Sequence, residues 1–150
     1  MPRIAREASV AWQGSLSRGS GVARAGTGAF ELPVDLPSRI GDPDGKTSPE
    51  ELLAAAHAAC FITSLAGEVA RSGGTVEHLD VRCTVTMDEV GEKGHLIVSS
   101  ELDARGRAEG IDEAGFELAA AAADEACPFS ALIRATATVS VQATLENEEA

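Results

Sequence analysis

Large aromatic side chains are scarce in this chain of 150 residues: aromatics make up 3% of it, and tyrosine is absent. A hydrophobic core must therefore rely on leucine, isoleucine, valine and alanine. A chain this rich in alanine is expected to fill part of its core by association with another subunit. The length and a hydrophobic content of 44% are typical of one globular domain, which we place at 1–150.

Clustered positive charge is also missing. The chain has 24 acidic and 12 basic residues, a net charge of −12, and no run of lysine or arginine. Nucleic acids and anionic membranes both attract clustered cations, so we expect neither as a partner. No apolar stretch reaches the roughly 18 residues of a membrane span. The segment 1–7 lacks the apolar core of a signal peptide, so the sequence predicts a cytoplasmic protein.

Motifs for metals and common cofactors are absent as well. The chain has no C-x-x-C or H-x-x-x-H pair, no glycine-rich nucleotide loop and no G-x-S-x-G elbow. We therefore expect no metal and no cofactor. The three cysteines are an odd number, which argues against a structural disulfide framework in a reducing compartment.

The pattern of apolar residues predicts an α+β fold with a largely antiparallel sheet and helices on one face. The chain reads as strands, a long helix, strands, a helix and a last strand. The expected elements are strands near 8–12, a turn near Gly14, a hairpin connection at 17–21, a loop at 33–46, a helix at 49–71, strands at 81–88 and 96–104, a helix at 112–126, a helical turn at 129–132, a strand at 133–145 and a loose tail at 146–150.

The long helix has clear start and stop signals. Ser48 is a typical N-cap, Pro49 suits the first helical position, and Glu51 lies three residues after the cap. Ser72-Gly73-Gly74 is a typical stop. Cys60 falls on the side of the helix that we expect to be buried or to form an interface, together with Leu52, Leu53, Ala56 and Thr63.

Cys60 allows two interpretations. It is either a small apolar residue on a buried helix face or a reactive thiolate. A thiolate needs a stabilising group nearby. His57 lies three residues earlier on the same side of the helix, while Arg18, Arg24 and Arg39 lie in earlier segments that can fold over it.

Cys127 also allows two interpretations. It directly precedes Pro128, which must break the helix, so the thiol lies at a helix end. The backbone N–H groups of a following helical turn would favour a thiolate there, whereas the alternative is a small residue at a kink. Cys83 alternates with valine and methionine along a strand and is interpreted as a core residue, although its role stays open.

Several segments together resemble the OsmC/Ohr family of thiol-dependent peroxidases, in its OsmC-like branch. The resemblance covers nearly the whole chain. It is carried by Ala11-Trp12-Gln13-Gly14 and Arg18-Gly19-Ser20-Gly21, by the helix from Ser48-Pro49-Glu50-Glu51-Leu52 to His57-Ala58-Ala59-Cys60-Phe61, and by Cys127-Pro128-Phe129-Ser130.

The resemblance implies a role for each reactive residue. Cys60 would be the peroxidatic cysteine and Cys127 the resolving cysteine, joined in a disulfide during turnover. An arginine would stabilise the thiolate, held by Glu50; we prefer Arg39 over Arg18 for this arginine. The implied substrate is an organic hydroperoxide, and the implied reductant is a dithiol such as a lipoylated protein.

One consequence concerns the oligomer. Ten helical residues rise about 15 Å, so Glu50 and Cys60 on one straight helix cannot share a small site. Either the helix is broken between them, or Glu50 serves the Cys60 of a second subunit. The second option predicts an intertwined homodimer, which the resemblance also implies.

Three rival functions stay open at this stage. A hydrolase using Cys60 and His57 would leave Cys127 dispensable. A thiol redox sensor or binding module of the same fold would form the disulfide but turn over slowly. A peroxidase-like fold without activity is disfavoured by the intact set of Cys60, Cys127, Arg39 and Glu50.

Overall fold

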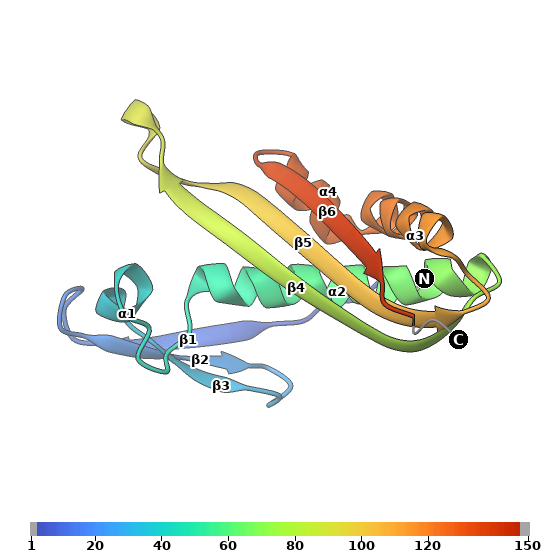
Figure 1. The fold of residues 1–150 in the computed structure, drawn as a ribbon. Helices are drawn as coiled ribbons and strands as arrows, with labels where there is room; N and C mark the ends of the chain where they lie inside the picture. The colour runs from blue at the N-terminus through green and yellow to red at the C-terminus, as the bar shows by residue number, and fades with distance from the viewer. Residues whose placement is uncertain (1–2, 148–150) are drawn as a thin grey trace. The chain divides into compact units, whose positions relative to one another are not determined.

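The computed structural model describes residues 3–147, which form two compact units. The N-terminal unit extends to Leu52 and the C-terminal unit begins at Leu53. Figure 1 shows the elements of both units, which are described separately below. A mixed α+β chain was expected, and this is confirmed, but the strands form two three-stranded sheets in place of one.

The N-terminal unit contains one antiparallel sheet in the order β1-β2-β3. Its elements are β1 (Ala8–Gln13), β2 (Ser20–Ala25), β3 (Glu31–Val34) and α1 (Leu36–Ile40). The predicted first strand and the turn at Gly14, where φ is +92°, are confirmed. The loop predicted at 33–46 is wrong in part, because it contains the end of β3 and the short helix α1. Asp35 caps α1 by accepting the backbone N–H of Ser38 at 2.8 Å.

Helix α2 (Pro49–Arg71) has the predicted bounds. The Ser48 hydroxyl accepts the backbone N–H of Glu51 at 3.1 Å, which is the expected N-cap bond. At the other end, the N–H groups of Gly73 and Gly74 donate to the carbonyls of Ala70 and Val69. This pair of bonds is a Schellman motif, and Gly73 supplies the positive φ of +88° that it requires.

The C-terminal unit contains a mixed sheet in the order β4-β5-β6 (Figure 1). Its strands are β4 (Thr75–Glu89), β5 (His95–Glu109) and β6 (Thr138–Leu145), with the 3-10 turn η1 (Gly91–Lys93) between the first two. β4 and β5 pair antiparallel, whereas β6 runs parallel to β5. The parallel pair requires a crossover, which α3 (Glu113–Ala126) and α4 (Pro128–Arg134) supply.

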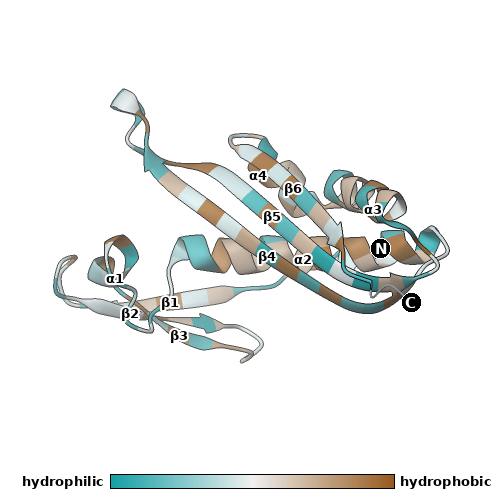
Figure 2. Cartoon of the chain, viewed as in Figure 1, coloured by the Kyte–Doolittle hydropathy of each residue, from teal (hydrophilic) through white to brown (hydrophobic). Residues whose placement is uncertain are grey.

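Helices α2 and α3 pack on one face of this mixed sheet and form its core. Along β4 and β5 apolar and polar residues alternate, as Figure 2 shows, and the apolar side faces the helices. Phe116 of α3 lies directly over Gly106, where a Cβ atom would come within 2.9 Å of its ring. The buried core members are Phe61, Leu65, Val69, Leu102, Ala104, Ala108, Phe116, Ala119, Ala120, Ala123 and Cys127.

Two predicted boundaries near the C-terminus are corrected. The last strand begins at Thr138, not at 133, because Ile133 belongs to α4, where its side chain is 6% exposed. The start of the tail is not loose. The Glu146 N–H donates to the Gly106 carbonyl at 2.7 Å, and the Asn147 amide makes two hydrogen bonds to the backbone of Ala108. The rest of that predicted tail lies outside the described residues.

By length and composition alone, α2 is long and apolar enough to cross a membrane. The expectation that no stretch reaches this length therefore holds only for uninterrupted apolar runs. Phe61, Leu65 and Val69 of this helix are buried in the core of the C-terminal unit, so a packing role accounts for much of its apolar character.

Candidate active site

Cys127 lies at the junction of two helices. It ends α3 and caps α4, and its backbone N–H donates to the Asp124 carbonyl at 3.3 Å. Pro128 is the first residue of α4, so the predicted helix break is confirmed. The Cys127 side chain is fully buried within the core of the C-terminal unit.

Cys60 is half-buried beside the buried stripe of α2. That stripe consists of His57, Phe61, Leu65 and Val69, at a spacing of four residues. The buried side of α2 is thus one residue further along the helix than the side predicted to contain Cys60 and Thr63. Thr63 is exposed. Cys60 itself packs against the core cluster, of which Cys127 is a buried member.

Two neighbouring features disfavour the thiolate form of Cys60. Burial raises the pKa of the Cys60 thiol, and the nearby Cys127 thiol raises it further. The backbone N–H of Phe129 acts in the opposite direction, because it stabilises the thiolate. Within the C-terminal unit the balance favours the neutral thiol, so an activated Cys60 needs a cation from outside this unit.

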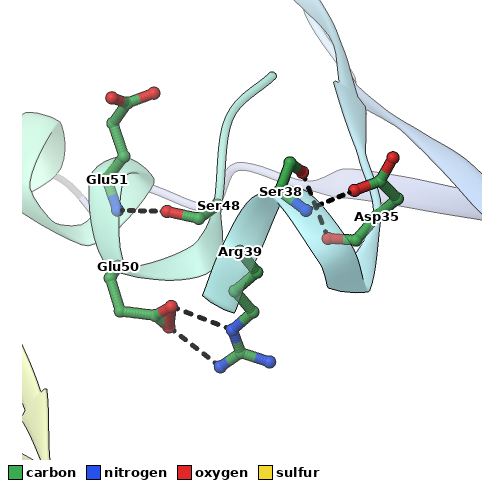
Figure 3. Close-up of polar contacts among 6 residues, drawn as sticks. All are labelled: Asp35, Ser38, Arg39, Ser48, Glu50 and Glu51. Atoms are coloured by element: carbon green, nitrogen blue, oxygen red, sulfur yellow. Dashed lines mark hydrogen bonds and ion pairs between the residues drawn. The ribbon is translucent and has the colours of Figure 1, made fainter. Parts of the chain in front are cut away.

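Arg39 and Glu50 form a bidentate ion pair within the N-terminal unit (Figure 3). The Arg39 Nε and Nη2 atoms donate to the two Glu50 carboxylate oxygens at 2.8 and 2.9 Å. Arg39 lies on α1, and Glu50 lies in the first turn of α2. Hydrogen bonding to Glu50 raises the pKa of the Arg39 guanidinium. The neighbouring Glu51 accepts the Thr47 hydroxyl at 2.8 Å, so the two glutamates have different partners.

Arg39 borders a mostly apolar cavity of about 380 Å³ in the N-terminal unit. The lining residues are Val10, Trp12, Leu16, Ala23, Val34, Asp35, Leu36, Arg39, Thr47, Pro49 and Leu52. Arg18, the alternative arginine, lies in the turn after β1 and is not among them. Arg24 forms an exposed ion pair with Glu31 at 3.4 Å.

His57 is fully buried, and both of its ring nitrogens are engaged. Nδ1 lies 2.7 Å from the Ser100 hydroxyl, and Nε2 lies 2.8 Å from the Ser130 hydroxyl. Burial lowers the pKa of His57, so the imidazole is kept neutral. Of the candidate groups for stabilising a Cys60 thiolate, His57 is therefore not a source of positive charge.

Cys83 belongs to the same buried polar group. Its Sγ atom lies 3.2 Å from the Ser100 hydroxyl and 3.8 Å from His57 Nδ1. Burial raises the pKa of the Cys83 thiol, which disfavours a reactive thiolate. Its position on the core side of β4 agrees with the predicted core role.

Sequence reasoning assigned no role to Ser100 and Ser130. Both hydroxyls are completely buried, and both contact His57. A signal was present for Ser100, because it shares the strand face of Leu102 and Ala104, and a polar side chain on an apolar face requires a partner. For Ser130 no local pattern identifies a partner 73 residues away.

Among residues 3–147 no group of three or more histidine, cysteine, aspartate or glutamate side chains is arranged to hold a metal ion.

Comparisons with known proteins place the chain in a family. The model of the family described as OsmC-like protein matches residues 41–142. The peroxiredoxin OsmC of Escherichia coli strain K12 is 32% identical over 132 residues, which cover 87% of this chain and 91% of that protein. The peroxiredoxin OsmC of Shigella flexneri matches equally well.

Solved structures show the same fold. An organic hydroperoxide resistance protein OsmC from Legionella pneumophila has a TM-score of 0.71 at 24% identity, covering 98% of this chain and all of that one. The organic hydroperoxide resistance protein OhrB of Bacillus subtilis has a TM-score of 0.68 at 21% identity, covering 91% of this chain and 97% of that one. The chain therefore belongs to the OsmC-like protein family.

Proposed function

We propose that this protein is a thiol-dependent peroxidase that reduces organic hydroperoxides to alcohols. The observation that carries the proposal is the packing of the half-buried, free Cys60 against the core cluster that contains the buried, free Cys127. The curated relatives are named peroxiredoxins, which supports peroxidase chemistry. Arg39 and Glu50 complete the set of reactive residues in this proposal.

The cycle has three steps. The Cys60 thiolate attacks the terminal peroxide oxygen, so that an S–O bond forms, the O–O bond breaks, and the leaving alkoxide takes a proton to become the alcohol. The Cys127 thiol then attacks the Cys60 sulfenic acid, which forms the disulfide and releases water. An external dithiol, such as a lipoyl group, reduces the disulfide and is itself oxidised to a disulfide.

The first step needs a stabilised thiolate, which the surroundings of Cys60 in the C-terminal unit do not favour. Helix α2 is continuous from Pro49 to Arg71, so a break between Glu50 and Cys60 is not available to bring them together. Their positions along the helix axis differ by about 15 Å. We therefore assign the Arg39–Glu50 pair of one subunit to the Cys60 of a second subunit, in an intertwined homodimer.

The weak core of the N-terminal unit supports this homodimer. Among residues 3–52, Ala23 is the apolar side chain that reaches full burial. Val10, Trp12 and Leu16 border the cavity beside Arg39 and are 61%, 41% and 69% exposed in the single chain. Apolar surface gathered around a cavity is a typical protein interaction or ligand site. A partner subunit would cover this surface and bring its Cys60 to Arg39.

The test is peroxide reduction by the purified protein with dihydrolipoamide as the dithiol. We expect faster consumption of tert-butyl hydroperoxide than of hydrogen peroxide, because the cavity is mostly apolar. Cys60→Ser should be inactive. Cys127→Ser should complete a first turnover and then over-oxidise to the sulfinic acid at Cys60. Cys83→Ser is the matched control, since Cys83 is also a free cysteine, and it should keep most of the activity.

Other outcomes separate the rival functions. Persistent turnover by Cys60→Ser would show that this residue is not the peroxidatic cysteine. Disulfide formation without sustained turnover would favour a redox sensor. A hydrolase that uses His57 as a base is disfavoured already, because the ring of this residue is buried between two serine hydroxyls.

A further inference from the structure

The buried imidazole of His57 connects three elements of the C-terminal unit. It lies on α2, and its two ring nitrogens meet Ser100 on β5 and Ser130 on α4. All three side chains are completely buried. Breaking the bond to Ser130 would leave buried polar atoms unpaired, at a cost of about 1–3 kcal/mol. The imidazole therefore restrains the position of α4 relative to α2.

The position of this link along the chain relates it to both reactive cysteines. His57 precedes Cys60 by three residues on α2, and Ser130 follows Cys127 by three residues. Residues three apart lie about one helical turn from each other. The His57–Ser130 bond thus joins the turn before one thiol to the turn after the other.

A second interaction near Cys127 is an ion pair that joins a different pair of helices. Arg134 Nη2 on α4 donates to the carboxylate of Asp124 on α3 at 2.6 Å. This ion pair fixes the angle between the two helices that flank Cys127, but neither helix carries Cys60. The His57–Ser130 bond runs from the Cys127 segment to the helix of Cys60, so it bears on the distance between the thiols.

We propose that His57, acting through Ser130, is a positioning residue for the step in which Cys127 attacks oxidised Cys60. The bond holds the Cys127 segment against α2 so that the two sulfur atoms remain within reach. Its role in turnover rests on the peroxidase function proposed above. The geometric part, that the bond sets how readily the disulfide forms, stands without it.

Disulfide formation competes with over-oxidation of Cys60, so the effect of positioning on its rate can be measured. The Cys60 sulfenic acid either loses water as it forms the disulfide with the Cys127 thiol, or takes an oxygen atom from a second hydroperoxide to become sulfinic acid, releasing another alcohol. The fraction lost to sulfinic acid reports the rate of disulfide formation against a reaction that does not involve Cys127.

Two serine substitutions form a matched pair for the test. Ser130→Ala removes the hydrogen bond to α4, whereas Ser100→Ala removes an equally buried hydrogen bond to β5 and leaves the His57–Ser130 bond in place.

After one equivalent of tert-butyl hydroperoxide, disulfide formation should be about tenfold slower in Ser130→Ala, as expected for the loss of one buried hydrogen bond. Over-oxidation, measured by mass spectrometry, should rise accordingly. The oxidation rate of Cys60 should stay within about twofold of wild type in both variants, because each serine hydroxyl bonds to the His57 ring.

A second arm does not depend on peroxidase activity. In glutathione redox buffers, the equilibrium between the Cys60–Cys127 disulfide and the two thiols gives their effective concentration. We expect about a tenfold lower value for Ser130→Ala and no change for Ser100→Ala. This arm decides the geometric inference even if wild-type protein does not react with peroxide, which would refute only the proposed function.

Equal behaviour of the two serine variants would overturn the inference, because unchanged values exclude positioning and equal losses indicate general packing. Should Ser130→Ala fail to fold, the triple variant His57→Leu, Ser100→Ala, Ser130→Ala replaces the whole polar group by apolar side chains, a change that can be nearly neutral for stability. It must show the same tenfold loss of effective concentration, and a wild-type value would refute the role of His57.

Discussion

At the residue scale, the two halves of the proposed site have opposite electrostatic tendencies. Cys60 lies where burial and a neighbouring thiol raise its pKa, and Arg39 is held as a cation by Glu50. A thiolate at Cys60 becomes favourable only when a cation approaches, since an opposite charge lowers the pKa of a thiol. Oxidation of Cys60 should therefore depend on a guanidinium that its own environment does not supply.

The choice between the two candidate arginines gives a first prediction. Arg39→Ala should lower kcat/KM for tert-butyl hydroperoxide by about 10- to 100-fold, the range expected for losing hydrogen bonds to a charged group. It should also raise the pKa of Cys60, measured from the pH dependence of alkylation by iodoacetamide. Arg18→Ala is the matched control and should stay near wild type. A large loss in Arg18→Ala together with an active Arg39→Ala would reverse the assignment.

His57 gives a prediction about stability and pH. Burial lowers its pKa, which Asp124 opposes and Arg134 reinforces. The folded state therefore binds its proton less readily than the unfolded chain, whose histidine pKa is about 6.5. The contribution of neutral His57 to the stability of the folded state is complete above the unfolded-state pKa of about 6.5 and is lost as the pH falls below it. The free energy of unfolding should decrease below pH 6.5 by at most about 1.4 kcal/mol per pH unit from this group.

The comparison that checks this is wild type against His57→Gln, by urea unfolding between pH 7.5 and 5 at one protein concentration. The variant should show a flatter pH dependence over that range. His78 and His95 are exposed and present in both proteins, so their contributions cancel. Asp35, whose pKa is lowered from 3.8 by its bonds to Ser38, titrates below the window. Identical slopes in the two proteins would contradict a neutral buried His57.

At the element scale, local signals predicted the helices well where the responsible contacts are themselves local. The start of α2 depends on Ser48 and Glu51, and its end depends on Gly73 and Gly74, all within a few residues. The short helix α1 was missed because three prolines and two glycines in 33–46 favour a loop, although Asp35 is a good cap.

The boundary between α4 and β6 shows why other features were not predictable. Ile133 and Ala137 fit an alternating strand, but residues four apart also share a helix face, so the pattern is ambiguous. Ile133 belongs to the helix because its side chain is buried there, and this burial depends on tertiary packing that the local sequence does not reveal. The same limit applies to the site: the cysteine motifs were visible, whereas the partners of His57 come from residues 43 and 73 positions away.

Two glycines of the α2 region should respond in opposite directions to the same substitution. Gly73→Ala should destabilise the protein by about 1 kcal/mol, because its positive φ disfavours any side chain although the space is open. Gly67→Ala should stabilise it by about 0.5–1 kcal/mol, since alanine is the better helix former and its Cβ atom would meet only the end of the Arg71 side chain. Urea unfolding measures both. A loss of stability in Gly67→Ala would indicate that another chain covers this face.

At the scale of the whole molecule, the described residues divide unevenly between a unit with a core and a unit almost without one. The core cluster belongs to the C-terminal unit, while the N-terminal unit buries little more than Ala23 among its apolar side chains. Neither the split into two sheets nor the parallel pairing of β6 with β5 follows from local sequence, because both depend on contacts between distant segments. The shortage of large side chains led us to expect that a second subunit completes the core, and this stays a prediction.

The proposed homodimer makes a direct prediction for solution measurements. Sedimentation equilibrium at assay concentration should give twice the chain mass of 15.4 kDa. Trp12→Glu places a charge in the apolar lining of the cavity beside Arg39 and should shift the protein toward the monomer, with loss of activity. A monomer that is fully active at assay concentration would refute the shared site.

Mixing two inactive variants tests whether the site is shared between subunits. In a shared site, Cys60 of one subunit works with Arg39 of the other. An Arg39→Ala chain paired with a Cys60→Ser chain therefore has one site in which both residues are intact and one in which both are altered. If each site used residues of a single chain, every site in the same heterodimer would lack one essential group. Unfolding and refolding equal amounts of the two variants together should produce heterodimers as half of the dimers, and so restore about a quarter of wild-type activity. Native mass spectrometry verifies that heterodimers have formed; heterodimers without recovered activity would place Arg39 and Cys60 in one chain.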